Sequence, residues 1–255
     1  MPGDRGSGAL RLVSVLSAVI GGAPLLGLGL FLWLGSVEIV PLAVADPVGV
    51  ALWDAAISVA FFLQHSGMVR RGFRVRVERY VDPAVYPALY SIASGIALLL
   101  VLVLWQRSST VVWSVPLPWG LALRAAFVSA VVGFVWGLQA LRGFDGFGLR
   151  QIRDLVRSRT RPPEGLAIRG PYRWVRHPLY SFVLIMMWAC PEATLDRVLL
   201  NGLWSLWVIV GAVLEERDLL RDFGDDYARY QDAVPMIVPR TLRPAWSDGI
   251  GERNA

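Results

Sequence analysis

The sequence predicts an all-α, polytopic integral membrane bundle of about five to six transmembrane helices, and composition and patterning support this. Of the 255 residues, 55% are hydrophobic and only 18% are charged, and the mean hydropathy is +0.50. A soluble domain usually carries about 25% charged residues. Apolar runs of the length that crosses a bilayer, about 20 residues, alternate with loops in which the arginines gather.

Four apolar runs in the N-terminal half are long enough to span a membrane, and they cover residues 12–34, 48–68, 86–105 and 119–141. The first run follows Arg5 and Arg11 and could be a signal peptide, but its length and the lack of a clear cleavage site favour a retained span. Two further runs, 178–190 and 198–214, follow a long arginine-rich segment. The first of them is short, so the pair predicts either one tight hairpin or two spans.

The distribution of arginine predicts the orientation of the chain. Only Arg107 and Arg197 fall in the loops of one side, and Arg124 falls within a span. The positive-inside rule therefore places both termini in the cytoplasm. Topology also explains the net charge of +5, so we expect the lipid bilayer and not nucleic acid as a partner.

The sequence offers no cluster of metal ligands. Cys190 is the single cysteine, which excludes an intrachain disulfide and a multi-cysteine metal site. The two histidines, His65 and His177, are far apart in the chain. We therefore expect no metal ion.

Two motif-like blocks, residues 169–180 and 215–239, flank the C-terminal apolar hairpin. Pro178 biases His177 away from helical geometry and is itself favoured in the first turn of a helix, so His177 should directly precede the helix that enters the membrane. Such a helix start attracts anions. Antiparallel packing of the hairpin would bring Glu215 and Glu216 close to His177.

Charged and aromatic side chains in these blocks suit a zwitterionic cofactor. Arg173 and Arg176 add positive charge, and the nearby aromatic residues are Tyr172, Trp174, Tyr180 and Tyr227. The alternative is an interfacial belt, in which such residues only anchor helix ends.

The order and spacing of the blocks carry a family resemblance. They read Gly-Pro-Tyr-x-x-x-Arg-His-Pro-x-Tyr and Glu-Glu-x-x-Leu-x-x-x-Phe-Gly-x-x-Tyr-x-x-Tyr-x-x-x-Val-Pro. Over residues 169–239 the chain resembles the isoprenylcysteine carboxyl methyltransferase and phospholipid methyltransferase superfamily. The resemblance implies an integral-membrane enzyme that uses S-adenosylmethionine. The residues that it assigns to the cofactor are Tyr172, Arg176, His177, Pro178, Leu179, Tyr180, Glu215 and Glu216, and it leaves open which glutamate makes contact.

The N-terminal half narrows the resemblance. Residues 61–70, Phe-Phe-Leu-Gln-His-Ser-Gly-Met-Val-Arg, are similar to the second span of bacterial methanethiol S-methyltransferases. This similarity implies S-methylation of a small thiol, such as methanethiol to dimethyl sulfide, in a bacterial plasma membrane. The alternatives are a lipid or isoprenylcysteine methyltransferase, a membrane sterol-type NADPH reductase and a non-catalytic scaffold.

Polar residues in the second predicted span are the candidates for catalysis. His65 would accept the proton of the thiol, or an arginine such as Arg70 would stabilise the thiolate, while Gln64 points at the substrate. Asp54 shares a helix stripe with His65, but about 16 Å of helix separates them. The alternative is that His65 forms an interhelical hydrogen bond that holds the bundle together.

The motifs divide the chain into three predicted parts. Residues 1–141 form a four-helix transmembrane region on the substrate side, residues 142–240 form the methyltransferase core, and residues 241–255 form a flexible tail. Residues 142–165 are either a lid that orders on cofactor binding or a simple connector.

Overall fold

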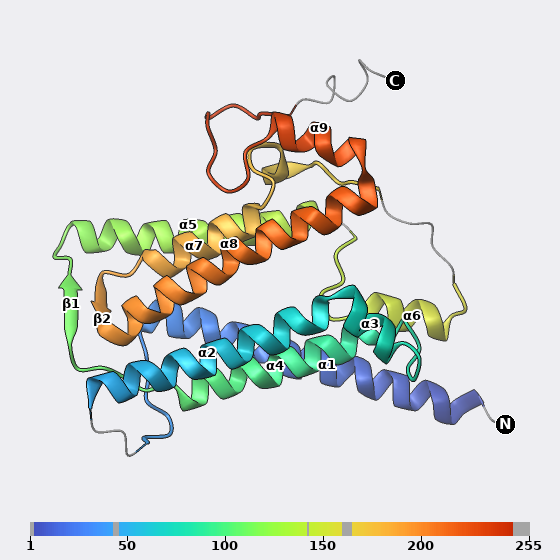
Figure 1. Ribbon diagram of the computed structural model, residues 1–255, viewed down its shortest axis with the longest axis horizontal. Coiled ribbons are helices and arrows are strands. Elements are labelled where there is room, and N and C mark those ends of the chain that lie inside the picture. Colours follow the sequence, from blue (N-terminus) through green and yellow to red (C-terminus); the bar gives the residue numbers. More distant parts are fainter. Residues whose placement is uncertain (1–2, 43–45, 142, 160–164, 247–255) are drawn as a thin grey trace. The chain divides into compact units, whose positions relative to one another are not determined.

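The regular secondary structure of the chain is almost entirely helical, which confirms the predicted class (Figure 1). The computed structural model describes residues 3–42, 46–141, 143–159 and 165–246. Five helices are long and apolar enough to cross a membrane, and they are α1 (Gly3–Leu34), α2 (Pro47–Val69), α4 (Tyr86–Leu104), α5 (Trp119–Ala140) and α8 (Leu195–Phe223). Helix α7 (Pro178–Trp188) is apolar but short, as expected for the first arm of the hairpin.

Shorter elements connect the long helices, and they are α3 (Arg71–Val77), β1 (Val111–Ser114), α6 (Leu149–Val156), η1 (Gly170–Arg173), β2 (Glu192–Thr194) and α9 (Asp225–Ala233). Strands β1 and β2 pair into a two-stranded sheet, which the sequence did not predict. Three- and four-residue strands give too short an alternation to be recognised between apolar helices.

The chain separates into two compact units. The first comprises Met1–Trp113, Asp145–Pro162 and Ala193–Leu203, and the second comprises Ser114–Phe144, Pro163–Glu192 and Trp204–Ala255.

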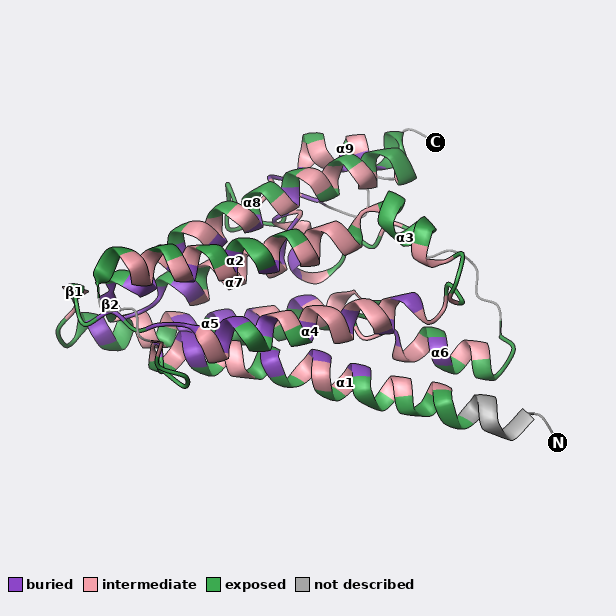
Figure 2. Cartoon of the chain, turned by 60° about the horizontal axis from the view of Figure 1, so that its bottom comes forward, coloured by how far each residue is buried: buried purple, intermediate pink, exposed green. Residues whose placement is uncertain are grey.

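Buried and exposed residues alternate along the long helices (Figure 2). Leu26, Leu52 and Leu63 are among many large apolar side chains that are more than two-thirds exposed. Such a surface suits contact with lipid.

Helices α1 and α4 approach closely in the first unit because both carry glycine at the contact. A Cβ atom on Gly21 would lie 2.0 Å from Ser91 Oγ, and one on Gly95 would lie 2.0 Å from the Ile20 carbonyl oxygen. Ser17 donates to the Phe147 carbonyl at 2.7 Å, which fixes the start of α6 to α1. Residues 145–159 are therefore packed onto the N-terminal helices.

Buried polar groups tie helix ends together in the first unit. Asp196 accepts hydrogen bonds from Trp105 Nε1 at 3.1 Å and from the Ser108 N–H at 3.0 Å. Arg197 donates to the carbonyls of Phe31 and Leu32 in the last turn of α1. Arg197 thus donates to carbonyls in the last turn of α1, where the helix itself supplies few donors.

In the second unit, glycines on α5 receive side chains of α7. A Cβ on Gly133 would lie 2.4 Å from Phe182 Cε1, and one on Gly137 would lie 2.7 Å from Leu179 Cδ2. The small residues let the two helices pack closely. This packing fixes the position of α7, whose first turn forms part of the site described next.

Substitution of Gly133 by alanine tests this packing. We expect Gly133→Ala to lower the free energy of unfolding by about 1–3 kcal/mol, because the added methyl overpacks the contact with Phe182. The measurement is the thermal unfolding midpoint of the detergent-purified protein. Gly211→Ala on α8 is the control, since a Cβ there meets nothing within 4 Å. Equal midpoints for the two variants would contradict the prediction.

Candidate cofactor site

The site begins at the first turn of α7. His177 has φ −121° and ψ 62° and directly precedes Pro178, the first residue of the helix, as the sequence predicted. The backbone N–H groups of Leu179 and Tyr180 point out of this helix start, where no earlier turn supplies an acceptor. This end of α7 is therefore suited to an anionic group.

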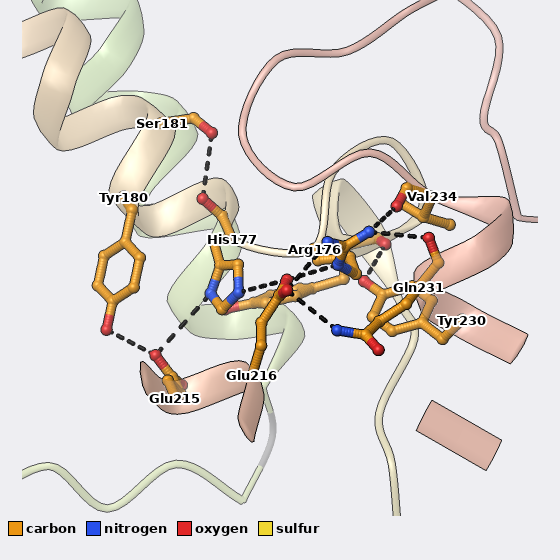
Figure 3. A network of polar contacts seen from close by, with 10 residues as sticks. Arg176, His177, Tyr180, Ser181, Glu215, Glu216, Tyr230, Gln231 and Val234 are labelled. Carbon is orange, nitrogen blue, oxygen red and sulfur yellow. Dashed lines mark hydrogen bonds and ion pairs between the residues drawn. The ribbon is translucent and has the colours of Figure 1, made fainter. Parts of the chain in front are cut away.

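The last turns of α8 present two adjacent glutamates to this helix start (Figure 3). Neighbouring residues on an α-helix point about 100° apart, so the two carboxylates meet different partners. The side chain of Glu216 is 12% exposed, and that of Glu215 is 47% exposed.

Glu216 is enclosed by hydrogen-bond donors. Arg176 donates to its two carboxylate oxygens from Nε at 2.6 Å and from Nη2 at 3.1 Å. His177 Nε2 lies 3.1 Å from Oε1, and Gln231 Nε2 donates to Oε2 at 3.0 Å. Both oxygens are thus engaged, so Glu216 holds the site together and has little capacity left for a ligand.

Glu215 is held more loosely. Tyr180 donates its hydroxyl hydrogen to Oε2 at 2.7 Å, and His177 Nδ1 lies 3.8 Å from the same oxygen. The rings of His177 and Tyr180 stack, with centroids 5.3 Å apart and an interplanar angle of 8°. A half-exposed carboxylate therefore lies beside two parallel aromatic faces.

The segment 231–246, which we call the C-terminal strap, crosses the start of α7 and binds it through main-chain oxygens. Arg176 Nη1 donates to the carbonyls of Gln231, at 2.9 Å, and Val234. The strap also accepts from the backbone N–H groups of Arg176, at 2.9 Å, and His177, at 3.0 Å. The site thus needs both chain segments, which lie about sixty residues apart in sequence.

The strap is also anchored at its far end. The carbonyl of Arg173 accepts from the N–H groups of Ala245 and Trp246, and Arg173 Nε donates to the Trp246 carbonyl at 3.0 Å. The indole of Trp246 packs edge-on against Tyr230, whose hydroxyl donates to the Tyr172 carbonyl at 2.6 Å. A flexible tail was expected from residue 241, and residues 247–255 of it lie outside the described chain.

Three tyrosines around the site are buried or partly buried. Burial raises the pKa of Tyr172, Tyr227 and Tyr230 above the ordinary value of a phenol, so all three are neutral near pH 7. Tyr227 is 1% exposed. These phenols line the site without adding charge.

The structure brings together most of the cofactor residues expected from the sequence. Arg176, His177, Tyr180, Glu215 and Glu216 form one network. The remaining expected residues contribute in other ways. Arg173 binds the strap at Trp246, and the Tyr172 carbonyl accepts from Tyr230 on α9. Pro178 starts α7, and Leu179 packs at Gly137.

The side chain of Gln231 and the main-chain carbonyls of the strap were not expected from the sequence to form part of the site. The Val-Pro pair at the end of the second block was the only signal of the strap, because main-chain acceptors have no residue signature.

The expected catalytic residues lie in the first unit. The hydroxyl of Tyr90 on α4 is 2.8 Å from His65 Nε2 and 3.2 Å from Nδ1, so His65 does take part in an interhelical hydrogen bond. Gln64 Nε2 contacts the sulfur of Met68 at 3.0 Å, and Arg70 marks the break between α2 and α3. Tyr90 was not expected from the sequence. The catalytic role of these residues stays a prediction.

The fold and the site define an α-helical integral membrane protein whose polar site joins the start of one apolar helix to the end of another. The chain belongs to the NnrU protein family, whose model matches residues 55–245.

Several relatives carry the name of an enzyme, and others do not. The chain is 38% identical over 196 residues to the methanethiol S-methyltransferase of Pseudomonas sp. (strain GM41(2012)), which covers 74% of this chain and 73% of the relative. It is 33% identical over 199 residues to that of Mycobacterium tuberculosis, covering 77% and 82%. Nurim of Rattus norvegicus is 26% identical over 176 residues, covering 66% and 67%. No solved structure matches the chain.

These findings confirm the resemblance to the methanethiol S-methyltransferases. The matches extend well beyond the two motif blocks, since the family model begins at residue 55. The family match therefore covers most of the second span, in which Gln64 and His65 lie, as well as the C-terminal motifs.

The different surroundings of the two glutamates predict different effects on stability. We expect Glu216→Gln to destabilise the protein by about 3 kcal/mol or more, because it leaves the guanidinium of Arg176 largely enclosed without its counter-charge. Glu215→Gln should change stability by less than about 0.5 kcal/mol, as for most exposed sites. Thermal unfolding midpoints in one detergent measure both. Equal destabilisation by the two variants would contradict this division of roles.

Proposed function

We propose that the chain is an integral-membrane, S-adenosylmethionine-dependent methyltransferase that methylates the sulfur of a small thiol, such as methanethiol to dimethyl sulfide. Its similarity to named methanethiol S-methyltransferases over three quarters of its length carries the proposal. The polar network at α7 and α8 supports it, because its available groups match a zwitterionic cofactor.

The fit can be argued group by group. S-adenosylmethionine carries a carboxylate, an ammonium and a sulfonium. The N–H groups at the start of α7 suit the carboxylate. The half-exposed Glu215 carboxylate suits a cation, and the ring of Tyr180, which stacks on His177, offers a face that attracts one. Of the two glutamates, we therefore assign cofactor contact to Glu215 and assign Glu216 to positioning Arg176 and His177.

The remaining chemistry concerns the thiol. The bound cofactor supplies a methyl group that is already activated toward nucleophiles. The chain has to hold the sulfur lone pair in line with that methyl and exclude water. A thiol reacts as its thiolate. We propose that His65 takes the thiol proton while hydrogen-bonded to Tyr90, with Gln64 orienting the substrate and Arg70 as the alternative group that stabilises the thiolate.

We also propose that both termini and the cofactor site face the cytoplasm of a bacterial cell. The support is the concentration of arginine in the segments at the corresponding ends of the predicted spans. S-adenosylmethionine is a polar, charged molecule that does not cross a bilayer unaided, so a cytoplasmic site gives it direct access.

Titration with S-adenosylhomocysteine, the cofactor product, tests the cofactor assignment. We expect the purified protein to bind it in isothermal titration, and Glu215→Gln to weaken binding about tenfold or more through loss of a charge-assisted contact. Asp218→Asn, a charge-neutralising change one turn further along α8, is the matched control and should bind normally. Normal binding by Glu215→Gln would remove Glu215 from the cofactor site.

Headspace detection of dimethyl sulfide from methanethiol tests the substrate. Binding of S-adenosylhomocysteine without this product would refute the small-thiol proposal and favour a lipid or isoprenylcysteine acceptor. Binding of a nicotinamide cofactor in its place would favour a reductase.

Loss of the imidazole tests proton transfer. We expect His65→Ala to reduce turnover about 100-fold, the usual contribution of a general base, with unchanged affinity for S-adenosylhomocysteine. Leu63→Ala on the same helix, at a side chain that is 71% exposed, is the control. Full turnover by His65→Ala at neutral and low pH would exclude His65 as the base.

A further inference from the structure

The segment that follows α2 combines positive charge with exposed apolar side chains. We call residues 69–80 the basic segment; it contains α3 and carries five arginines and one glutamate. No residue of α3 is buried. A seven-residue helix is far too short to be stable in water by itself, so its stability has to come from contacts with something else.

Large apolar side chains of the basic segment are exposed. Val69 is 53% exposed, Phe73 41%, Val75 46% and Tyr80 86%. They alternate with arginines directly after a helix that is apolar enough to span the bilayer. Helices with this composition lie in the membrane interface, with apolar side chains at the acyl boundary and basic groups among the headgroups.

The charge of the segment is largely uncompensated. Arg74 pairs with Glu78 at 2.6 Å and lies over the Tyr86 ring, 5.8 Å from its centroid. Arg71, Arg76 and Arg79 are exposed and have no ion-pair partner among the residues that the structure describes. Three guanidinium groups are thus available to an external anion.

Topology alone does not account for this arrangement. The positive-inside rule explains why arginines occur in this loop, but it requires neither a folded helix nor exposed Phe73 and Val75. We infer that the basic segment is a binding surface for anionic phospholipid headgroups, with phosphate bound by Arg71, Arg76 and Arg79 and with Phe73 at the acyl boundary. Arginine suits phosphate because its planar fork donates two parallel hydrogen bonds.

Native mass spectrometry of the full chain in detergent tests the inference. Phosphatidylglycerol and phosphatidylcholine with identical acyl chains are titrated separately, and the dissociation constant of the first bound lipid is compared. We expect the anionic lipid to bind at least tenfold more tightly than the zwitterionic one. Arg71→Gln/Arg76→Gln should lose most of that preference, because each arginine contributes roughly fivefold to it.

The control is Arg240→Gln/Arg243→Gln, which removes the same charge at exposed positions of the strap. It should keep the preference to within about twofold. Thermal unfolding midpoints verify that both double variants are folded. If the Arg71→Gln/Arg76→Gln variant does not fold, the comparison of the two lipids on the unmodified chain still tests the inference.

Three results would overturn the inference: equal affinity of the unmodified chain for both lipids, an equal loss in both variant pairs, or displacement of the lipid by millimolar inorganic phosphate. The last would identify a site for free phosphate. None of them bears on the methyltransferase proposal, which is measured by cofactor binding and product.

Discussion

The enclosed carboxylate of Glu216 is the constraint on which the second unit depends. A charge removed from water is costly unless a counter-charge and hydrogen bonds replace the lost hydration. Arg176 supplies both with a two-point contact, and His177 and Gln231 complete the set of donors. Arg176 lies in the turn before α7, His177 is the N-cap residue of α7, and Gln231 lies on α9. One carboxylate thereby fixes three elements at the end of α8.

The same geometry separates two residues that are identical in chemistry and adjacent in sequence. Rotation by one residue along α8 turns Glu216 toward Arg176 and turns Glu215 toward Tyr180, where it stays about half exposed. An α-helix can therefore assign one carboxylate to structure and its neighbour to ligand binding without any loop or insertion. Under the proposed assignment, stability of the site thus depends on Glu216, whereas binding of a ligand depends on Glu215.

Much of the arrangement could be predicted from sequence because its signals are strong and local. Length and hydropathy located the five long helices, and the His-Pro step located the start of α7. The pairing of that start with the glutamates followed from an antiparallel hairpin. The β1–β2 pair, Tyr90 and the strap gave no comparable signal. Tyr90 lies within an apolar run, where a tyrosine looks like any other span residue, and Gln231 lies on a polar surface helix.

The way in which the strap is bound has a consequence for how the family can diverge. Its contacts to the start of α7 come from the carbonyl oxygens of Gln231, Val234, Pro235, Met236 and Ile237, which every amino acid provides. Substitutions along these positions can therefore accumulate while the hydrogen bonds persist, provided that the backbone path is kept. Insertions and deletions, in contrast, would shift the register of every contact at once. In distant homologues, the length of this segment should be retained more strictly than its residues.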